Sequence, residues 1–298
     1  MHDVKDDPAK CVAILVTAYN PVVEELFHNI ASYSEQVSLI VIFDNSDRPE
    51  TCADIRKSAF AYKNITVIGD GVNHGIATAQ NLATDYAIEQ GYEFFLEMDQ
   101  DSRLPLEYVS KVFLSYQKLS QAGHLLGGLG PVAVRESDNF VYGGFPDNGL
   151  HRVEYTLSSG FLFSLDAWKK VGRKDDSLFI DFVDWDWCWR CGKKNLEIFV
   201  DAKLKISHIL GDGYRKIAGF DVGVPSPVRH YYQYRNSLFL LRKSYVPMGW
   251  KLKRILINSL KLPIYCFMLR DGPTRRGYIL RGIIDFFKGR VGPIPLVK

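Results

Sequence analysis

The sequence lacks any hydrophobic run long enough to cross a membrane. In this chain of 298 residues the longest uninterrupted apolar run is Leu262–Leu269, which contains a proline, whereas a membrane-spanning helix needs roughly 20 apolar residues. The segment Met1–Lys10 is charged and has neither the apolar core nor the cleavage site of a signal peptide. We therefore expect a protein that is not integral to a membrane and that stays in the cytoplasm.

Cysteine is scarce, and its spacing gives no disulfide framework. The five cysteines lie at positions 11, 52, 188, 191 and 266, an odd number scattered over a long chain. This usage is typical of a reducing compartment. Cys188 and Cys191 have the spacing of a redox or zinc half-site, but no second pair accompanies them. Buried helix thiols are the favoured interpretation of this pair.

Acidic residues are few in the last part of the chain, so the net charge of +3 conceals a division. Residues 216–298 contain 16 Lys or Arg and 3 Asp or Glu, which leaves 21 basic and 31 acidic residues in residues 1–215. We therefore divide the chain into an acidic body, residues 1–215, and a basic amphipathic C-terminal region, residues 216–298.

Large apolar residues alternate with basic ones in the C-terminal region, above all in residues 230–243 and 250–257. This pattern favours helices lying in an anionic membrane interface, with cations at the headgroups and side chains such as Trp250, Leu252 and Phe267 below them. A solvated basic face over an ordinary core stripe, an oligomer interface and a nucleic-acid surface are the alternatives. The apolar content exceeds what phosphate binding requires, so we expect no nucleic-acid partner, while a homo-oligomer stays open.

Strands and helices alternate through the first third of the chain. Short β-branched runs predict buried strands at Cys11–Thr17, Leu39–Phe43, Ile65–Ile68 and Phe94–Met98, and helical periodicity lies between them at Val22–Gln36, Pro49–Phe60 and Ile76–Gln90. This order predicts an α/β fold with a Rossmann-like, mostly parallel sheet. The second half is more mixed, with strands expected at 125–134, 140–144, 153–157, 196–200 and 204–207, and helices at 164–171 and 184–191.

Polar residues follow the predicted parallel strands, where such sheets bind ligands. Tyr19 follows the first strand, Asp44 the second, the turn Asn73–Gly75 the third, and Asp99-x-Asp101 the fourth. Two carboxylates two residues apart on an extended chain point the same way, so they can share one hard divalent cation with phosphate oxygens. Asp44 can accept a hydrogen bond from a base or ribose hydroxyl, and the helix after Gly75 can direct its amino end at phosphate.

A second group of carboxylates lies among aromatic residues between Phe179 and Arg190. Desolvation there raises the pKa of Asp184 toward the working range of a general base, although its position also suits a helix N-cap. Asp186 and Arg190 have the spacing of a structural ion pair. His208, after the last strand, is either a third metal ligand or an ordinary histidine.

Six segments together resemble, in order, the motifs of family 2 inverting glycosyltransferases, and within that family the bacterial rhamnosyltransferases of polysaccharide assembly. The segments are Val12–Pro21, Asp44–Ser46, Asn73–Asn81, Asp99–Asp101, Ser159–Phe161 and Asp184–Arg190. The resemblance covers about residues 11–215. It implies a GT-A fold, a nucleotide-diphosphate sugar donor and Mg²⁺ or Mn²⁺.

The resemblance also assigns roles to single residues. Asp44 corresponds to the base-binding aspartate, Asp99 and Asp101 to the metal-binding pair, and Asp184, six positions before Arg190, to the catalytic base. Val183 departs from the acidic residue that many relatives carry before the base, which leaves Asp181 as a less favoured candidate. His208 resembles a late histidine that completes the metal site in some GT-A enzymes.

We therefore expect an inverting glycosyltransferase that moves L-rhamnose from dTDP-L-rhamnose onto a lipid-linked saccharide. Tyr19, Asp44, Asn73, Gly75 and Asp99 are the expected nucleotide-sugar contacts. We expect the enzyme to lie peripherally on the inner face of the cell membrane. A nucleotide-sugar or glycan-binding protein without catalysis, and a metal-dependent phosphohydrolase or nucleotidyltransferase, are the alternatives.

Overall fold

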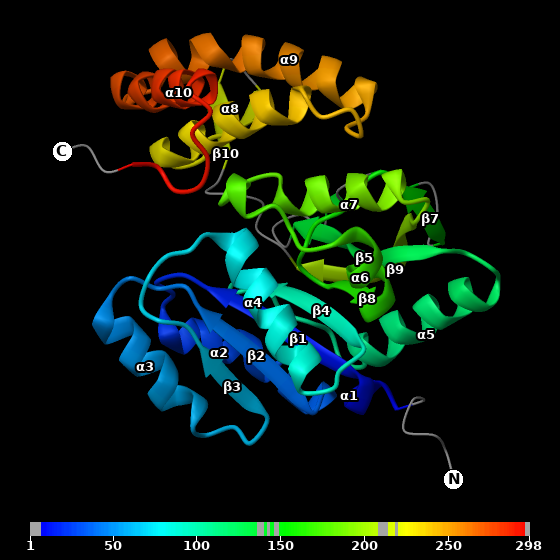
Figure 1. The fold of residues 1–298 in the computed structure, drawn as a ribbon. Coiled ribbons are helices and arrows are strands. Elements are labelled where there is room, and N and C mark those ends of the chain that lie inside the picture. Colours follow the sequence, from blue (N-terminus) through cyan, green and yellow to red (C-terminus); the bar gives the residue numbers. More distant parts are fainter. Residues whose placement is uncertain are drawn as a thin grey trace.

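The computed structural model describes residues 7–135, 140–141, 144–145, 149–207, 214–217 and 220–295. A sheet flanked by helices forms the body, and three C-terminal helices form a separate layer over the end of the sheet where α4 begins (Figure 1). His208 lies outside the described residues, so its predicted role as a metal ligand is not tested.

Four parallel strands form one half of the main sheet, in the order β3-β2-β1-β4. Helices and strands alternate along this part of the chain, close to the predicted order. They are α1 (Pro8–Cys11), β1 (Val12–Ala18), α2 (Val23–Ala31), a 3₁₀ turn (Ser34–Gln36), β2 (Leu39–Asp44), α3 (Pro49–Ala59), β3 (Ile65–Ile68), α4 (Ile76–Glu89) and β4 (Phe94–Asp99).

The other half of the sheet is mixed, as the less regular sequence predicts. β8 lies antiparallel to both β4 and β5, β9 is parallel to β5, and β7 is antiparallel to β9. The elements are α5 (Tyr108–Gln121), β5 (Leu126–Arg135), β6 (Phe140–Val141), β7 (Leu150–Val153), β8 (Phe161–Ser164), α6 (Leu165–Val171), a 3₁₀ turn (Asp176–Leu178), α7 (Val183–Lys193) and β9 (Glu197–Ser207).

Two expected strand boundaries in this half are wrong. β9 is one continuous strand instead of a pair, because an irregularity in its register with β5 takes up the residues between Asp201 and Lys205. β7 ends at Val153, where a strand was expected to begin. The segment after Val153 is not a strand, and Tyr155 in it packs its ring on Trp185 and Trp189.

Alternate residues of the central strands face two different helical layers. On β1, Ile14 and Val16 pack with residues of α2, α3 and α5, whereas Ala13 and Leu15 pack with residues of α4, α6 and α7. Both faces of the sheet are therefore covered, which explains why these strands read as continuous apolar runs.

The C-terminal layer consists of α8 (Pro227–Leu241), α9 (Met248–Pro263), a π-helical turn (Ile264–Met268) and α10 (Gly272–Phe287), preceded by a hairpin of β10 (Tyr214–Ile217) and β11 (Phe220–Gly223). α8 and α10 touch closely at Gly282, where a Cβ atom would lie 2.5 Å from the Tyr231 carbonyl oxygen. The Tyr231 hydroxyl donates a 2.9 Å hydrogen bond to the buried Asp285.

The prediction of a membrane-interface helix over residues 230–243 is wrong. Eight residues of α8 are buried, including His230, Arg235 and Asn236, which bond to protein groups. Trp250, also expected at a lipid surface, is only 6% exposed and packs against Trp189. Among the described residues no helix is both long and apolar enough to span a membrane.

Candidate active site at the carboxyl edge of the sheet

The predicted carboxylates meet at the carboxyl ends of three neighbouring strands. Asp44 pairs in register with Ala18, and Asp99 pairs in register with Thr17, so Asp44 and Asp99 end the strands on either side of β1. Two strand spacings separate them by about 10 Å. This separation suits a nucleoside diphosphate, with its base near Asp44 and its phosphates near Asp99.

Asp44 is fully buried, and only one of its two carboxylate oxygens has a hydrogen-bond partner. Its Oδ1 accepts a hydrogen bond from the Ser46 amide at 3.1 Å, whereas its buried Oδ2 has no hydrogen-bond partner. A buried carboxylate oxygen without a donor is costly. The ring N–H of a pyrimidine base is a donor of the kind that Asp44 lacks.

Tyr19 and Asn20 form a polar loop above Asp44. The Tyr19 amide donates a 2.7 Å hydrogen bond to the Gln100 side chain, which joins the ends of β1 and β4. Asn20 donates to Asp47 at 2.7 Å, and the Tyr19 hydroxyl donates to the same carboxylate at 3.2 Å. The Tyr19 ring, 44% exposed, is thereby held at the rim of the site.

The turn before α4 is held by protein groups. Asn73 Oδ1 accepts hydrogen bonds from the Gly75 amide and the Asn45 side chain, and the first amide of α4, Ile76, donates to the Phe179 carbonyl at 2.7 Å. A Cβ atom at Gly75, whose φ is +82°, would meet Phe179 at 2.5 Å. Contrary to expectation, the first amide of α4 is therefore not free to meet phosphate, while the sugar contacts of Asn73 and Gly75 stay predictions.

Asp99 and Asp101 offer oxygen ligands but no complete metal site. Asp99 Oδ1 accepts a 3.5 Å hydrogen bond from Ser158, and Asp101 is exposed. The buried Ser159 hydroxyl beside them has no hydrogen-bond partner. In the part of the chain that the structure describes, no group of three His, Cys, Asp or Glu side chains is placed to hold a metal ion.

Asp184 lies in the first turn of α7, not at its N-cap, which is Phe182. Its Oδ1 accepts a hydrogen bond from the Trp185 amide at 2.9 Å. Burial raises the pKa of Asp184 to about 7, with the negative charge of Asp99 adding to the rise and Lys174 opposing it. A carboxyl group with this pKa suits general base catalysis near neutral pH.

A buried ion pair beneath the site was not predicted. Lys174 Nζ lies 2.6 Å from the carboxylate of Glu97, and both side chains are at most 3% exposed. Glu97 precedes Asp99 by two residues on β4, so both point to the face covered by α4 and α7. Lys174 follows a Gly-Arg pair in a polar run that resembles an exposed loop, so the sequence contained no signal for it.

The loop that leads to Asp184 has an unusual backbone. Phe179, Asp181 and Phe182 all have positive φ, between 65° and 68°, which is costly for residues with side chains of this kind. Such backbone persists only where surrounding contacts enforce it. Here the contacts come from α8, far along the chain.

Arg235 and Asn236 of α8 supply those contacts. The Asn236 amide donates 2.8 Å hydrogen bonds to the carbonyls of Leu178 and Ile180, and Arg235 donates to the carbonyls of Ser177 and Leu178 at 3.3 and 3.2 Å. Both residues are fully buried. We refer to Arg235 and Asn236 as the α8 clamp.

Two other carboxylates of this segment form ion pairs with arginine side chains. Asp181 lies 2.6 Å from Arg229, which leaves it poorly suited as the alternative base. Asp186 forms the expected ion pair with Arg190 at 2.8 Å and also accepts a 2.6 Å hydrogen bond from Tyr245. Asp184 is therefore the carboxylate of this segment that the geometry favours as a base.

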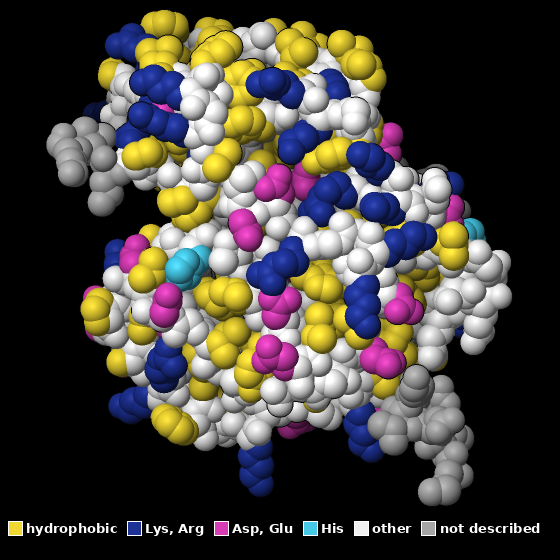
Figure 2. Space-filling view, viewed as in Figure 1, with side chains coloured by type: hydrophobic (Ala, Val, Ile, Leu, Met, Phe, Trp, Pro, Cys, Tyr) yellow, Lys and Arg dark blue, Asp and Glu magenta, His cyan; other side chains and the backbone are white. Residues whose placement is uncertain are grey.

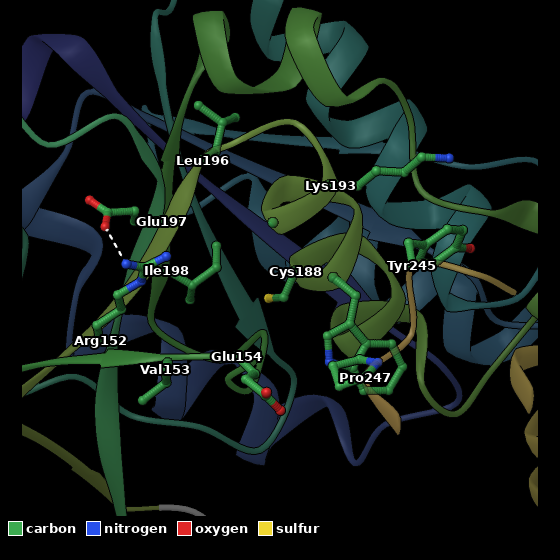
Figure 3. A pocket seen from close by; sticks show the side chains of 12 residues that line it. Arg152, Val153, Glu154, Cys188, Lys193, Leu196, Glu197, Ile198, Tyr245 and Pro247 are labelled. Carbon is green, nitrogen blue, oxygen red and sulfur yellow. Dashed lines mark ion pairs between the residues drawn. The ribbon is translucent and has the colours of Figure 1, made fainter. Parts of the chain in front are cut away.

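A cavity of about 570 Å³ opens farther along α7, between β9, the loop after β7 and the segment before α9 (Figure 3). Cys188 lines it one turn beyond Asp184, with Glu154, Lys193 and Tyr245 around it. Of the residues predicted for the nucleotide sugar or the metal, none that the structure describes lines this cavity. The candidate active site is therefore the edge of the sheet where these residues lie, and not this cavity.

Comparison with known proteins identifies the family of this chain. Residues 13–123 match the family described as Glycosyl transferase family 2. The chain is 32% identical over 265 residues to the dTDP-rhamnosyl transferase RfbF of Shigella flexneri, and the alignment covers 83% of this chain and 84% of that protein.

Solved structures share the fold at low identity. TarS 1-349 of S. aureus in complex with UDP-GlcNAc has a TM-score of 0.55 and 16% identity, with 93% of this chain and 80% of that chain covered. The chain spans 48% of the longer S. aureus TarS chain, about half its length. GalNAc-T7 with UDP, GalNAc and Mn²⁺ has a TM-score of 0.56 and 11% identity, with 83% and 54% covered.

We predict that Asn236→Ala loosens the loop before α7 without unfolding the body. Unpaired buried carbonyls cost about 1–3 kcal/mol, so hydrogen exchange of the Ile76 and Asp186 amides, both bonded to loop carbonyls, should accelerate about 10- to 100-fold. The matched control is Asn258→Ala, because Asn258 donates to Ser237 and not to the loop. Equal acceleration in both variants would contradict the role of the clamp.

Proposed function

Because this chain belongs to glycosyltransferase family 2 and is a glycosyltransferase of GT-A fold, we propose that it transfers L-rhamnose from dTDP-L-rhamnose to a lipid-linked saccharide with inversion. The name of the S. flexneri relative supports the donor. The observation that carries the proposal is the site itself, where Asp184, with a pKa of about 7, lies close enough to Asp99 for the two charges to interact.

The donor lies across the ends of β2, β1 and β4 in this proposal. The unpartnered Oδ2 of Asp44 accepts a hydrogen bond from the imide N–H of thymine, and Tyr19 borders the nucleoside. The diphosphate reaches the end of β4 at Asp99. Family membership argues against the two alternatives, a binding protein without catalysis and a phosphohydrolase.

Asp184 is the general base in this proposal. Its carboxylate takes the proton of an acceptor hydroxyl while that oxygen forms a bond to the anomeric carbon, and the bond from this carbon to the diphosphate oxygen breaks with its electron pair. Attack opposite to the leaving group inverts the configuration and needs no covalent enzyme intermediate. Lys174, whose charge opposes the rise in the pKa of Asp184, keeps part of the carboxyl ionised at neutral pH.

The residues at the end of β4 fit a hard divalent cation in part. Asp99 and Asp101 supply carboxylate oxygens, the ligands that Mg²⁺ and Mn²⁺ prefer, and leave coordination positions for phosphate. When bound, such an ion supplies Lewis-acid stabilisation of the departing diphosphate. His208 stays a proposed third ligand.

A panel of nucleotide sugars tests the donor. We expect dTDP-L-rhamnose to raise the midpoint of thermal unfolding more than UDP-GlcNAc or GDP-mannose, because a ligand that binds the native state stabilises it. Transfer to a lipid-linked acceptor should require Mg²⁺ or Mn²⁺ and stop with chelator. Activity that survives chelation would exclude the metal, and equal response to all donors would exclude the assigned specificity.

The pH dependence of turnover tests the base. The reactive form of Asp184 is the carboxylate, so kcat should rise with pH, about tenfold per unit below 7, and level off above the pKa of about 7. Asp184→Asn should lower kcat by about 10²- to 10⁴-fold while dTDP binding is retained. Asp166→Asn, at an exposed position of α6, is the control. A kcat profile that is flat between pH 5 and 8 would exclude Asp184 as the base.

Membrane association is part of the proposal, with the lipid-facing surface moved to α9 and α10. Apolar and basic side chains gather on this layer (Figure 2). Its exposed apolar residues include Leu252, Ile255, Leu256, Leu260, Phe267, Leu280, Ile284 and Phe287. Lys253, Arg276 and Lys288 lie exposed on the same helices. This composition suits the inner face of an anionic membrane.

Vesicle flotation tests this surface. Binding should increase with the fraction of anionic lipid and persist in part at high salt, because apolar burial is not screened. Leu256→Gln should weaken the binding that remains at high salt several-fold, whereas Leu106→Gln, at an exposed position of the body, should not. Binding that vanishes completely at high salt would show a purely ionic contact.

A further inference from the structure

Arg254 of α9 is a half-buried cation without a carboxylate partner. Its guanidinium carbon lies 4.8 Å from the centre of the Phe182 ring, 5.2 Å from Trp250 and 5.8 Å from Trp185. Its buried Nε has no hydrogen-bond partner, and none of the ion pairs found among the described residues includes it. Aromatic faces offset only part of the lost hydration of a cation.

Lys261 repeats this situation on the same face of α9. It follows Arg254 by seven residues, two turns of helix or about 10 Å along the axis, and is also partly buried. Its ammonium lies 6.0 Å from the Tyr265 ring and has no carboxylate partner among the described residues. Burial, together with the charge of Arg254, lowers the pKa of Lys261.

Arg254 lies beside the aromatic residues that surround the proposed base. Phe182 and Trp185, under the Arg254 guanidinium, flank Asp184 in the chain. Tyr155, whose ring centre lies 4.3 Å from that of Trp185, interacts with the charges of both Arg254 and Asp184. Partly exposed aromatic rings beside a base are suited to the apolar face of a pyranose ring.

The opposite face of α9 is apolar and exposed. Leu252, Ile255 and Leu256 are 50–63% exposed on the same turns that carry Arg254 inward. A ligand that contacts both faces of α9 needs an anionic group for the cations, a sugar for the aromatic rings and a lipid chain for the exposed apolar side chains. A ligand with only one of these groups would leave the other two sets of side chains without a contact.

We propose that Arg254 and Lys261 form an anion-binding strip that holds the diphosphate of the lipid-linked acceptor, while Trp185 and Tyr155 support its sugar at Asp184. This inference rests on the proposed function and identifies the acceptor as a saccharide joined to its lipid through diphosphate. The nucleotide sugar lies elsewhere, at the ends of β1, β2 and β4, so the two diphosphates occupy separate sites.

Binding of farnesyl diphosphate, followed by tryptophan fluorescence, tests the strip without turnover, because Trp185 and Trp250 lie beside it. We expect Arg254→Gln and Lys261→Gln each to weaken binding at least tenfold, Arg254→Lys to restore part of it, and Lys169→Gln, at an exposed position of α6, to leave it unchanged. Farnesol and inorganic pyrophosphate should bind at least tenfold more weakly than farnesyl diphosphate. Equal binding to wild type and both Gln variants would overturn the proposal.

Steady-state transfer separates an acceptor role from a structural one. Arg254→Gln should raise KM for a diphosphate-linked acceptor at least tenfold and leave KM for a neutral alkyl glycoside unchanged. Equal loss on both acceptors, with a lower thermal midpoint, would mean that Arg254 only packs on the aromatic rings. Lys261→Gln then decides between the two roles, because its ammonium lies near the Tyr265 ring and not against the rings that surround Arg254. If wild type transfers from no donor, the proposed function fails, while farnesyl diphosphate binding still tests the strip.

Discussion

The α8 clamp is the contact on which the candidate active site depends. A short loop with three positive-φ residues leads into α7 and sets the direction in which Asp184 leaves the backbone. Local preference opposes this conformation, so tertiary contacts must maintain it. Arg235 and Asn236 do so through backbone carbonyls, a use of buried polar side chains that leaves their bonding groups paired. Because the same loop binds the start of α4 through Phe179, the clamp also holds the turn beside the proposed nucleotide site.

Among the described carboxyl groups around Asp184, several neighbours form ion pairs, whereas Asp184 itself does not. Asp181 and Asp186 each lie against an arginine, and Glu97 lies against Lys174. Burial raises the pKa of Asp184 to about 7, because the opposing charge of Lys174 offsets only part of the lost hydration. Placing fixed charges around one titratable group in a dry region is how a protein fold tunes a base.

The C-terminal region contains two sets of residues that its composition does not separate. Its inner residues hold the loop before α7, whereas the outer faces of α9 and α10 carry apolar and basic side chains. Tyr231, Arg235 and Trp250 resemble interface residues in the sequence, because aromatic and cationic side chains suit both a lipid headgroup layer and a polar protein interior. Only the position of each residue on its helix distinguishes the two environments.

The sequence alone was sufficient to predict the sheet and the family. Cys11–Thr17 and Leu39–Phe43 predicted strands within a residue or two, since a strand covered on both faces is apolar at every position. The order of the motifs predicted the family, which the S. flexneri relative confirms. Tertiary structure alone decided that Lys174 pairs with Glu97 and that much of α8 is buried. It also decided that Asn236 shapes a loop more than 50 residues before it in the chain. These contacts join segments far apart in sequence, where no local periodicity or spacing connects the partners, so they exist only once the chain has packed.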